Sequence, residues 1–147
     1  MQDVFIIMGD RNTRKSATIR ALTGAFRKGE YQVATHIINM DVFVQISSLQ
    51  ESGISTQDFI REANQNSCIN VLVSLWIHQG NGQPNGLTYI QDFLNAGWNL
   101  RDIVVLGINN LPYNLPTGSS NPNFIPNSQN LPANQIASQI RGWWQWI

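Results

Sequence analysis

The fold is decided by the stretch Val4-Phe5-Ile6-Ile7-Met8-Gly9-Asp10-Arg11-Asn12-Thr13-Arg14-Lys15-Ser16. Its first five residues form an unbroken apolar run rich in branched side chains, which is typical of a parallel strand buried on both faces. Gly9 opens a polar turn after this strand, and a helix is expected to begin near Lys15. The stretch therefore predicts a strand, a turn and a helix in immediate succession, the first unit of an α/β domain.

The turn has the spacing of a phosphate-binding loop. Four residues separate Gly9 from Arg14, and Lys15 and Ser16 follow at once. This matches the pattern G-x-x-x-x-G-K-[ST], except that arginine replaces the second glycine. On these residues, the first third of the chain resembles the P-loop NTPases and kinases. The resemblance implies that Gly9 makes the turn, that Lys15 contacts terminal phosphate oxygens of ATP or GTP, and that the Ser16 hydroxyl helps to hold Mg²⁺.

The physical chemistry of the turn indicates the same class of ligand. Backbone N–H groups in a glycine-opened turn and at the start of a helix have no partners within the helix, so they can bind an anion together. Lys15 adds a compact positive charge, and a serine hydroxyl is an oxygen ligand of the kind that Mg²⁺ prefers. The residues expected to bind phosphate are Gly9, Asn12, Thr13, Arg14, Lys15, Ser16 and Ala17, with Ser16 as the metal ligand.

Arg14 is the departure from the pattern, and it leaves two orientations open. A glycine at this position lets the backbone approach a phosphate closely, so an inward arginine side chain would crowd the nucleotide. An outward side chain would instead add a guanidinium to the site. The competing interpretation of the whole stretch is a purely structural corner that binds nothing.

The rest of the chain alternates apolar runs with amphipathic stretches. Further buried strands are expected at residues 42–46, 70–77 and 102–108, and helices at residues 16–27, 55–66 and 86–98, with Gly29 ending the first helix. This alternation predicts a single domain over residues 1–147, with a three-layer, mostly parallel α/β sheet flanked by helices, like that of the P-loop NTPases. Residues 31–38 and 42–46 predict an added β-hairpin that turns at residues 39–41. A single long strand bent at Asp41 is the alternative.

Two C-terminal segments have distinct compositions. Residues 109–132 hold five of the six prolines and many Asn, Ser and Gly residues, which predicts a long loop. This loop is expected to cover a base through Tyr113 or Phe124, or to wrap another subunit. Residues 133–147 predict an amphipathic helix whose apolar stripe is Ile136, Ile140, Trp143, Trp144 and Ile147. Trp146 falls off this stripe and is expected to face a partner.

Catalysis requires more than a phosphate site, and the sequence offers few further groups for it. P-loop ATPases usually carry an acidic residue at the end of another buried strand, where it helps to hold Mg²⁺. Here the runs 71–77 and 104–108 are followed by histidine, glutamine and asparagine instead. The catalytic candidates are therefore Lys15, Asp10 inside the loop, and Glu51 after the second main strand. The alternative for Glu51 is a solvated residue at the entrance of a helix.

A kinase would also need mobile arginines that close over the transferred phosphate. Residues 109–132 contain no Arg or Lys, which leaves Arg11, Arg14, Arg61 and Arg101 as candidates. His78 follows a buried strand and could act as an acid or a base, although a hydrogen-bonded loop histidine is the simpler interpretation.

Composition narrows the classes of protein. The chain has 147 residues, a formal net charge of zero and a pI of about 6.7, so it lacks the positive field that drives non-specific nucleic-acid binding. Its charged fraction of only 12% gives little self-repulsion, which favours a homo-oligomer. No apolar run approaches the roughly 20 residues of a membrane span. The first strand begins too early to leave room for a signal peptide, so a cytoplasmic protein without a membrane partner is expected.

The leading functional hypothesis is a nucleotide-binding P-loop protein that hydrolyses ATP or GTP, or transfers a phosphoryl group, with Mg²⁺. The alternative is a degenerate P-loop protein that binds a nucleotide or another phosphorylated small molecule without turnover. Such a protein would regulate, sequester or assemble, and the Asn-rich, low-charge composition would suit a phage or mobile-element product. A third hypothesis is a structural or interaction protein built around residues 109–132 and the terminal tryptophans.

Overall fold

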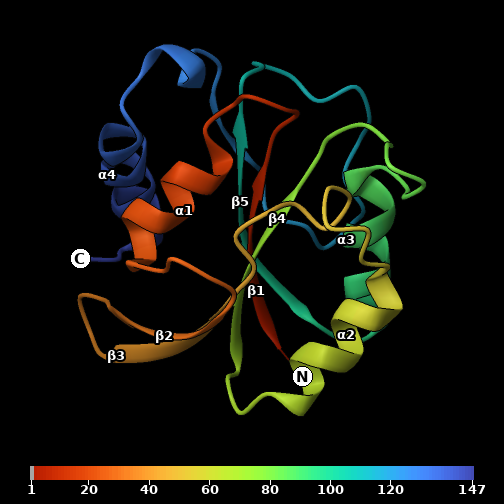
Figure 1. Ribbon diagram of the computed structural model, residues 1–147, viewed down its shortest axis with the longest axis horizontal. Coiled ribbons are helices and arrows are strands. Elements are labelled where there is room, and N and C mark those ends of the chain that lie inside the picture. Colours follow the sequence, from red (N-terminus) through yellow and green to blue (C-terminus); the bar gives the residue numbers. More distant parts are fainter. Residues whose placement is uncertain (1) are drawn as a thin grey trace.

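The computed structural model describes residues 2–147, which fold into a six-stranded sheet with helices on both faces (Figure 1). The strands are β1 (Asp3–Met8), β2 (Gly29–Ala34), β3 (Asn39–Val44), β4 (Asn70–Leu75), β5 (Asn99–Leu106) and β6 (Asn123–Ile125). The helices are α1 (Lys15–Thr23), α2 (Thr56–Gln65), α3 (Gly86–Asn95) and α4 (Ala133–Trp144), with a 3₁₀ turn, η1 (Ser128–Asn130), before α4. None of the helices in this range is both long and apolar enough to cross a membrane.

β1 lies in the interior of the sheet, whose strand order is β2-β3-β4-β1-β5-β6. It pairs in parallel with β4 on one side and with β5 on the other. β3 and β6 extend the parallel part, and β2 alone is antiparallel, to β3. The predicted α/β class, the mostly parallel sheet and the added hairpin are therefore confirmed.

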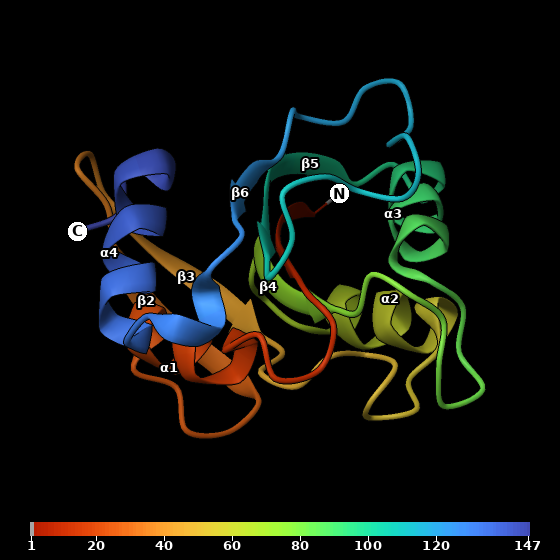
Figure 2. The same ribbon diagram turned by 90° about the horizontal axis from the view of Figure 1, so that it is seen from above.

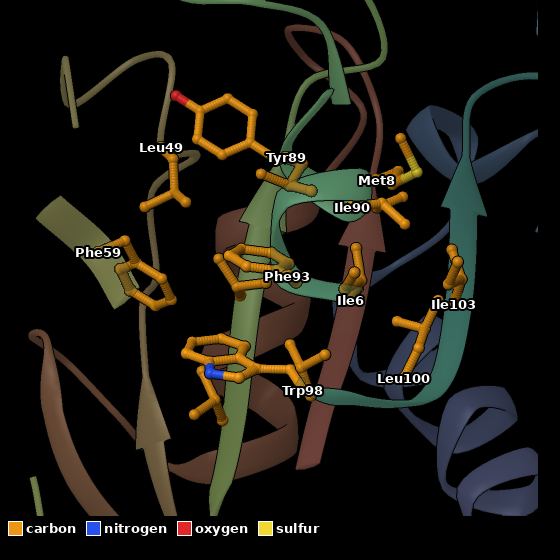
Figure 3. Packing of buried hydrophobic residues seen from close by; sticks show 14 of the residues in the cluster. Ile6, Met8, Leu49, Phe59, Tyr89, Ile90, Phe93, Trp98, Leu100 and Ile103 are labelled. Atoms are coloured by element: carbon orange, nitrogen blue, oxygen red, sulfur yellow. The ribbon is translucent and has the colours of Figure 1, made fainter. Parts of the chain in front are cut away.

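The sheet separates two hydrophobic layers. α1 and α4 cover one face, and α2 and α3 cover the other, as the view from above shows (Figure 2). Because successive strand residues point to opposite faces, Phe5 of β1 packs on the side of α1 and α4, whereas Ile6 packs on the side of α2 and α3. In this second layer the rings of Phe93 and Trp98 stack with their centroids 4.8 Å apart (Figure 3). Both faces of β1 are thus buried, as its apolar sequence predicts.

The hairpin turns earlier than the sequence indicates. Its turn falls at residues 35–38, so the predicted turn at residues 39–41 lies inside β3. Thr35 stabilises the turn locally, because its hydroxyl accepts hydrogen bonds from the N–H groups of Ile37 and Ile38. The alternative of one long bent strand is wrong, since β2 and β3 pair with each other.

The first helix is shorter than predicted. α1 ends at Thr23, where Gly24 adopts a φ of 73° and donates its N–H to the carbonyl oxygen of Arg20. This left-handed glycine cap stops the helix. Phe26, which falls inside the range predicted for this helix, therefore lies outside it and is 72% exposed. Gly29 begins β2 and does not end the helix.

The boundaries of the later elements differ by a few residues. α2 begins as predicted, because the Ser55 side chain accepts a hydrogen bond from the N–H of Asp58. α3 ends at Asn95, before the predicted end at Trp98, and β5 begins at Asn99, before its predicted start. The alternation of strands and helices is unchanged by these shifts.

Part of the segment 109–132 forms regular secondary structure. β6 pairs in parallel with β5 at the edge of the sheet, and η1 follows it. Before β6, the chain runs past α3 and returns (Figure 2). Tyr113 and Phe124 pack against the hydrophobic layer on the side of α2 and α3, and the Tyr113 hydroxyl donates to the carbonyl oxygen of Ile77 at 2.8 Å. The predicted loop is confirmed at residues 109–122, whereas residues 123–125 and 128–130 form β6 and η1, and both aromatic residues have packing contacts.

The C-terminal helix forms, but its last residues pack differently from the prediction. Of the expected stripe, Ile136, Ile140 and Trp144 are buried, whereas Trp143 and Ile147 are 38% and 66% exposed. The chain leaves the helix at Gln145, which has a φ of 58°. This turn places the Trp146 ring 5.2 Å from that of Phe5, and Trp146 is 3% exposed. The prediction that Trp146 faces a partner is wrong.

Candidate functional site

The loop between β1 and α1 lies at a topological switch point. β1 leads to α1 on one face of the sheet, whereas its neighbour β4 leads to α3 on the other face (Figure 1). Open α/β sheets form ligand-binding crevices at such points, outside the carboxyl ends of the strands. Residues 9–16, called the 9–16 loop below, occupy this place.

The backbone of the 9–16 loop needs glycine at one position and accepts arginine at another. A Cβ atom on Gly9 would lie 2.4 Å from Thr13 Oγ1 and 3.1 Å from the carbonyl oxygen of Leu106, so this close approach requires glycine. Arg14 has a φ of 75° and a ψ of 18°, in the left-handed region that favours glycine. Its side chain reaches η1, where Nη2 donates to the carbonyl oxygen of Gln129 at 3.4 Å.

Lys15 is a buried cation in this loop. The residue is 8% exposed, and its ammonium donates to the carbonyl oxygen of Asp10 at 2.7 Å and to Thr13 Oγ1 at 3.4 Å. Both of these partners are neutral groups. Burial lowers the pKa of Lys15 from 10.5 to about 8, although the charges of Asp10 and Glu51 act to raise it. Burial removes the water that would stabilise the charged ammonium, and an anion placed against it would stabilise this charged form instead.

Free backbone donors surround the lysine. The N–H groups of residues 11–17 have no acceptor among residues 2–147, and the first bond of α1 runs from the N–H of Thr18 to the carbonyl oxygen of Arg14. These residues, together with Glu51 and Trp76, line a hollow of about 320 Å³, called the loop hollow below. Of the predicted phosphate-binding residues, Asn12, Thr13, Arg14, Lys15, Ser16 and Ala17 line this hollow, and Gly9 does not.

The two candidate carboxylates have different surroundings. Glu51 is exposed and lines the loop hollow. Asp10 does not line it, because its carboxylate accepts hydrogen bonds from the N–H groups of Ile77 and His78 at 3.1 and 3.2 Å and lies 2.6 Å from the Nδ1 of His78. Burial raises the pKa of Asp10, but the hydrogen bonds from His78 and Ile77 outweigh burial and hold the pKa below its ordinary value. Asp10 therefore links the 9–16 loop to the chain that follows β4.

Two residues that the sequence did not single out contact the 9–16 loop, and Trp76 also lines the loop hollow. Trp76 is 6% exposed and lies beneath Arg11, whose guanidinium is 4.8 Å from the ring centroid. Ser128 of η1 is fully buried and donates its hydroxyl to the carbonyl oxygen of Thr13 at 2.9 Å. Trp76 could have been proposed from its place near the end of the apolar run 70–77. Nothing local marks Ser128, which lies 115 residues from its partner in a polar stretch.

The remaining charged candidates are divided between the site and other parts of the molecule. Arg11 and Arg14 line the loop hollow. Arg61 is paired within α2, and Arg101 is paired with an aspartate at the amino ends of the strands, so neither reaches the 9–16 loop. His78 is a hydrogen-bonded loop histidine beside Asp10.

Metal binding at this site would depend on a ligand as well as on the protein. Within residues 2–147, no group of three or more His, Cys, Asp or Glu side chains is arranged to hold a metal ion. The Ser16 hydroxyl lines the loop hollow and offers one oxygen, and phosphate oxygens and water would supply the others. The chain matches no protein-family model, no curated protein and no solved structure.

Proposed function

We propose that the 9–16 loop binds the phosphate groups of ATP or GTP together with Mg²⁺, and that the protein is a P-loop-like nucleotide-binding protein. The observation that carries this proposal is the buried Lys15 ammonium, which has only neutral hydrogen-bond partners and lies among free backbone N–H groups. Such an arrangement is costly unless an anion completes it. The left-handed backbone of Arg14 supports the same proposal, because the P-loop pattern has glycine at that position.

Each group of the loop has a role in the proposed complex. Lys15 and the N–H groups of residues 11–17 bind phosphate oxygens, and Ser16 contributes its hydroxyl to the metal. Bound Mg²⁺ would neutralise charge on the terminal phosphates. Glu51 is the predicted catalytic carboxylate that lines the loop hollow, and it is the candidate to orient a water or an acceptor hydroxyl for hydrolysis or phosphoryl transfer.

Binding without catalysis is the second candidate function. The carboxylate of Asp10 is engaged by Ile77 and His78, and the chain leaving β4 and β5 carries no carboxylate at their ends. These observations favour a protein that holds a nucleotide or another phosphorylated small molecule in a regulatory, sequestering or assembly role. The expected homo-oligomer stays a prediction, which sedimentation velocity tests directly.

Thermal unfolding with and without nucleotide tests the proposal. ATP or GTP with Mg²⁺, at about 100 times its Kd, should stabilise the protein by about 2.7 kcal/mol, which for this length raises Tm by about 5–10 °C. Lys15→Ala should abolish the rise. Arg61→Ala is the matched control, because Arg61 pairs with Asp58 on α2, away from the loop hollow.

The outcomes separate the hypotheses. The absence of any shift with both nucleotides would contradict the binding proposal in both of its forms. A shift that Lys15→Ala abolishes, accompanied by release or transfer of phosphate, supports an enzyme in which Glu51→Gln should then be slower. The same shift without phosphate release supports the binding-only function.

A further inference from the structure

A second hollow lies beside the loop hollow and shares Ser16 with it. It has a volume of about 200 Å³ and lies between α1, the connection that follows α1, and the chain that leaves β3. Its lining includes Ser16, Arg20, Phe26, Arg27, Gln45 and Ser47, and it is called the Phe26 hollow below. Like the loop hollow, it is at the carboxyl end of the sheet.

The Phe26 hollow carries positive charge that is not neutralised. Arg20 follows Ser16 by one helical turn on the same face of α1, and side chains on a helix slant toward its amino end. Arg20 and Arg27 form no ion pair within residues 2–147, whereas the neighbouring Lys28 is paired with Glu62 on α2. No Asp or Glu lines the hollow. Two free guanidinium groups match the charge of a phosphate monoester, which is about −1.5 to −2 at pH 7.

An exposed aromatic ring lies next to these charges. Phe26 is 72% exposed, although it is a large apolar residue, and the guanidinium of Arg27 lies 5.3 Å from its ring centroid. Stacking of a nucleic-acid base on such a ring is worth about 1–3 kcal/mol. A ligand that places a planar base on Phe26 and a phosphate near Arg20 would use both features.

A buried polar atom without a partner gives an independent indication of a ligand. Gln45 is 3% exposed and lines the Phe26 hollow. Its Nε2 donates to the carbonyl oxygen of Ser47 at 2.9 Å, but its Oε1 accepts no hydrogen bond from residues 2–147. Buried acceptors of this kind are costly when unmatched. The Oε1 atom itself is covered, so the Gln45 amide must turn toward the hollow before an amino or hydroxyl group of a ligand can satisfy it.

We infer that the Phe26 hollow binds a nucleoside monophosphate as a second ligand, beside the nucleotide on the 9–16 loop. Arg20 and Arg27 bind its phosphate, Phe26 stacks on its base, and the Gln45 Oε1 accepts a hydrogen bond from its base or ribose. The inference rests on the proposed function for its context, because Ser16 lies between the two hollows. The monophosphate site itself is tested without a triphosphate.

Isothermal titration calorimetry with AMP, GMP, CMP and UMP, each taken separately, measures this binding. We expect at least one monophosphate to bind, and its nucleoside and ribose 5-phosphate to bind at least tenfold more weakly. The double variant Arg20→Gln, Arg27→Gln should lower the affinity for the monophosphate at least tenfold, and so should Phe26→Ser. Arg61→Gln, an exposed arginine on another face, should leave the affinity within twofold. Circular dichroism and Tm confirm that each variant is folded.

Two further titrations locate the monophosphate. Lys15→Met should leave its affinity within twofold, and saturation with the Mg²⁺ complex of a non-hydrolysable ATP analogue should not displace it. Loss of monophosphate binding in Lys15→Met, or displacement by the analogue, would mean that it occupies the 9–16 loop, which overturns the inference. No binding of any monophosphate at about 5 mM, a concentration that detects a Kd in the millimolar range, also overturns it. Failure of the proposed function would give a different result: the ATP analogue would not bind, while the monophosphate still would.

Discussion

The Nδ1 atom of His78 lies 2.6 Å from a carboxylate oxygen of Asp10, and this contact ties the 9–16 loop to the chain that follows β4. The other carboxylate oxygen accepts hydrogen bonds from the N–H groups of Ile77 and His78. One side chain therefore joins two adjacent parallel strands beyond their carboxyl ends. The position of the 9–16 loop relative to β4 depends on this side chain more than on the histidine ring.

Removal of Asp10 should therefore cost more stability than removal of His78. Asp10→Ala leaves two backbone N–H groups without their acceptor, and we expect a loss of about 1–3 kcal/mol. His78→Ala removes a largely exposed pair and should cost about 0–1 kcal/mol. Urea unfolding at pH 7 measures both. Equal losses in the two variants would contradict the assignment of Asp10 as the link.

Nucleotide affinity should decrease as the pH rises above about 8, the pKa to which burial lowers Lys15. Below this pH the ammonium is charged and binds phosphate, and above it the free protein must first take up a proton, so affinity decreases by up to about tenfold per pH unit. A phosphate monoester loses its second proton near about pH 6, so the charge of ATP changes little above about pH 8. Calorimetric titrations from pH 7 to 9.5 test this. Lys15→Arg, which stays charged, is the control, and a flat profile in the parent protein would refute the prediction.

The ligand-free protein should change in the opposite direction over the same range. Between the folded pKa of about 8 and the ordinary value of 10.5, the unfolded chain binds more protons at Lys15 than the folded chain does. The contribution of Lys15 to the free energy of unfolding therefore increases with pH in this window. Comparison of the parent with Lys15→Met isolates this contribution. A difference between them that is constant from pH 7 to 10 would be inconsistent with a lowered pKa.

Arg14→Gly should stabilise the loop relative to Arg14→Ala. Both variants remove the guanidinium and its contact with Gln129, but only glycine adopts a φ of 75° without steric cost. The left-handed conformation costs other residues about 1–2 kcal/mol, and the greater freedom of unfolded glycine offsets about 0.4–1 kcal/mol of this. We expect a net difference of about 0.5–1 kcal/mol in urea unfolding, with glycine the more stable. A more stable alanine variant would show that the backbone there is not left-handed.

The parts of the fold that were predictable depend on local pattern. The apolar run 4–8 makes a buried strand, and the periodicity of the later stretches gives the alternation of strands and helices. The turn at residues 35–38 was missed because threonine has a high strand propensity. In the structure, the Thr35 hydroxyl instead stabilises the turn by accepting hydrogen bonds from Ile37 and Ile38. β6 was missed because a strand of three residues, 123–125, is stabilised by pairing with β5 and not by its own sequence.

The candidate site, like the fold, was predictable from the sequence only where local pattern determines it. The spacing from Gly9 to Ser16 was sufficient to expect a compact loop with Lys15 and Ser16 at one hollow. The carboxylate of Asp10 was expected to take part in chemistry, but its partners at the end of β4 are set by the register of two strands. Ser128 could not be predicted as part of the site, because its contact with the 9–16 loop arises from tertiary packing.

Ser128→Ala should loosen the 9–16 loop. Ser128 is fully buried, and its hydroxyl donates a hydrogen bond to the carbonyl oxygen of Thr13. Its loss leaves that buried acceptor unmatched, and we expect a destabilisation of about 1–3 kcal/mol. Hydrogen exchange should speed up at residues 11–17 more than in the sheet. Ser67→Ala, at an exposed serine, is the control. Equal effects of the two changes would argue against a stabilising role for the hydrogen bond from Ser128 to Thr13.

The packing of the C-terminal tryptophans gives the sharpest contrast between neighbouring residues. Trp146 is 3% exposed, and its ring lies within 5.2 Å of Phe5 and 5.0 Å of Trp144. Trp146→Ala should cost about 3–5 kcal/mol, as expected for a large aromatic side chain removed from a core. Trp143 is 38% exposed, and Trp143→Ala should cost less than about 1 kcal/mol. Urea unfolding followed by circular dichroism measures both, and a small loss at residue 146 would restore the interpretation of that ring as a partner-binding surface.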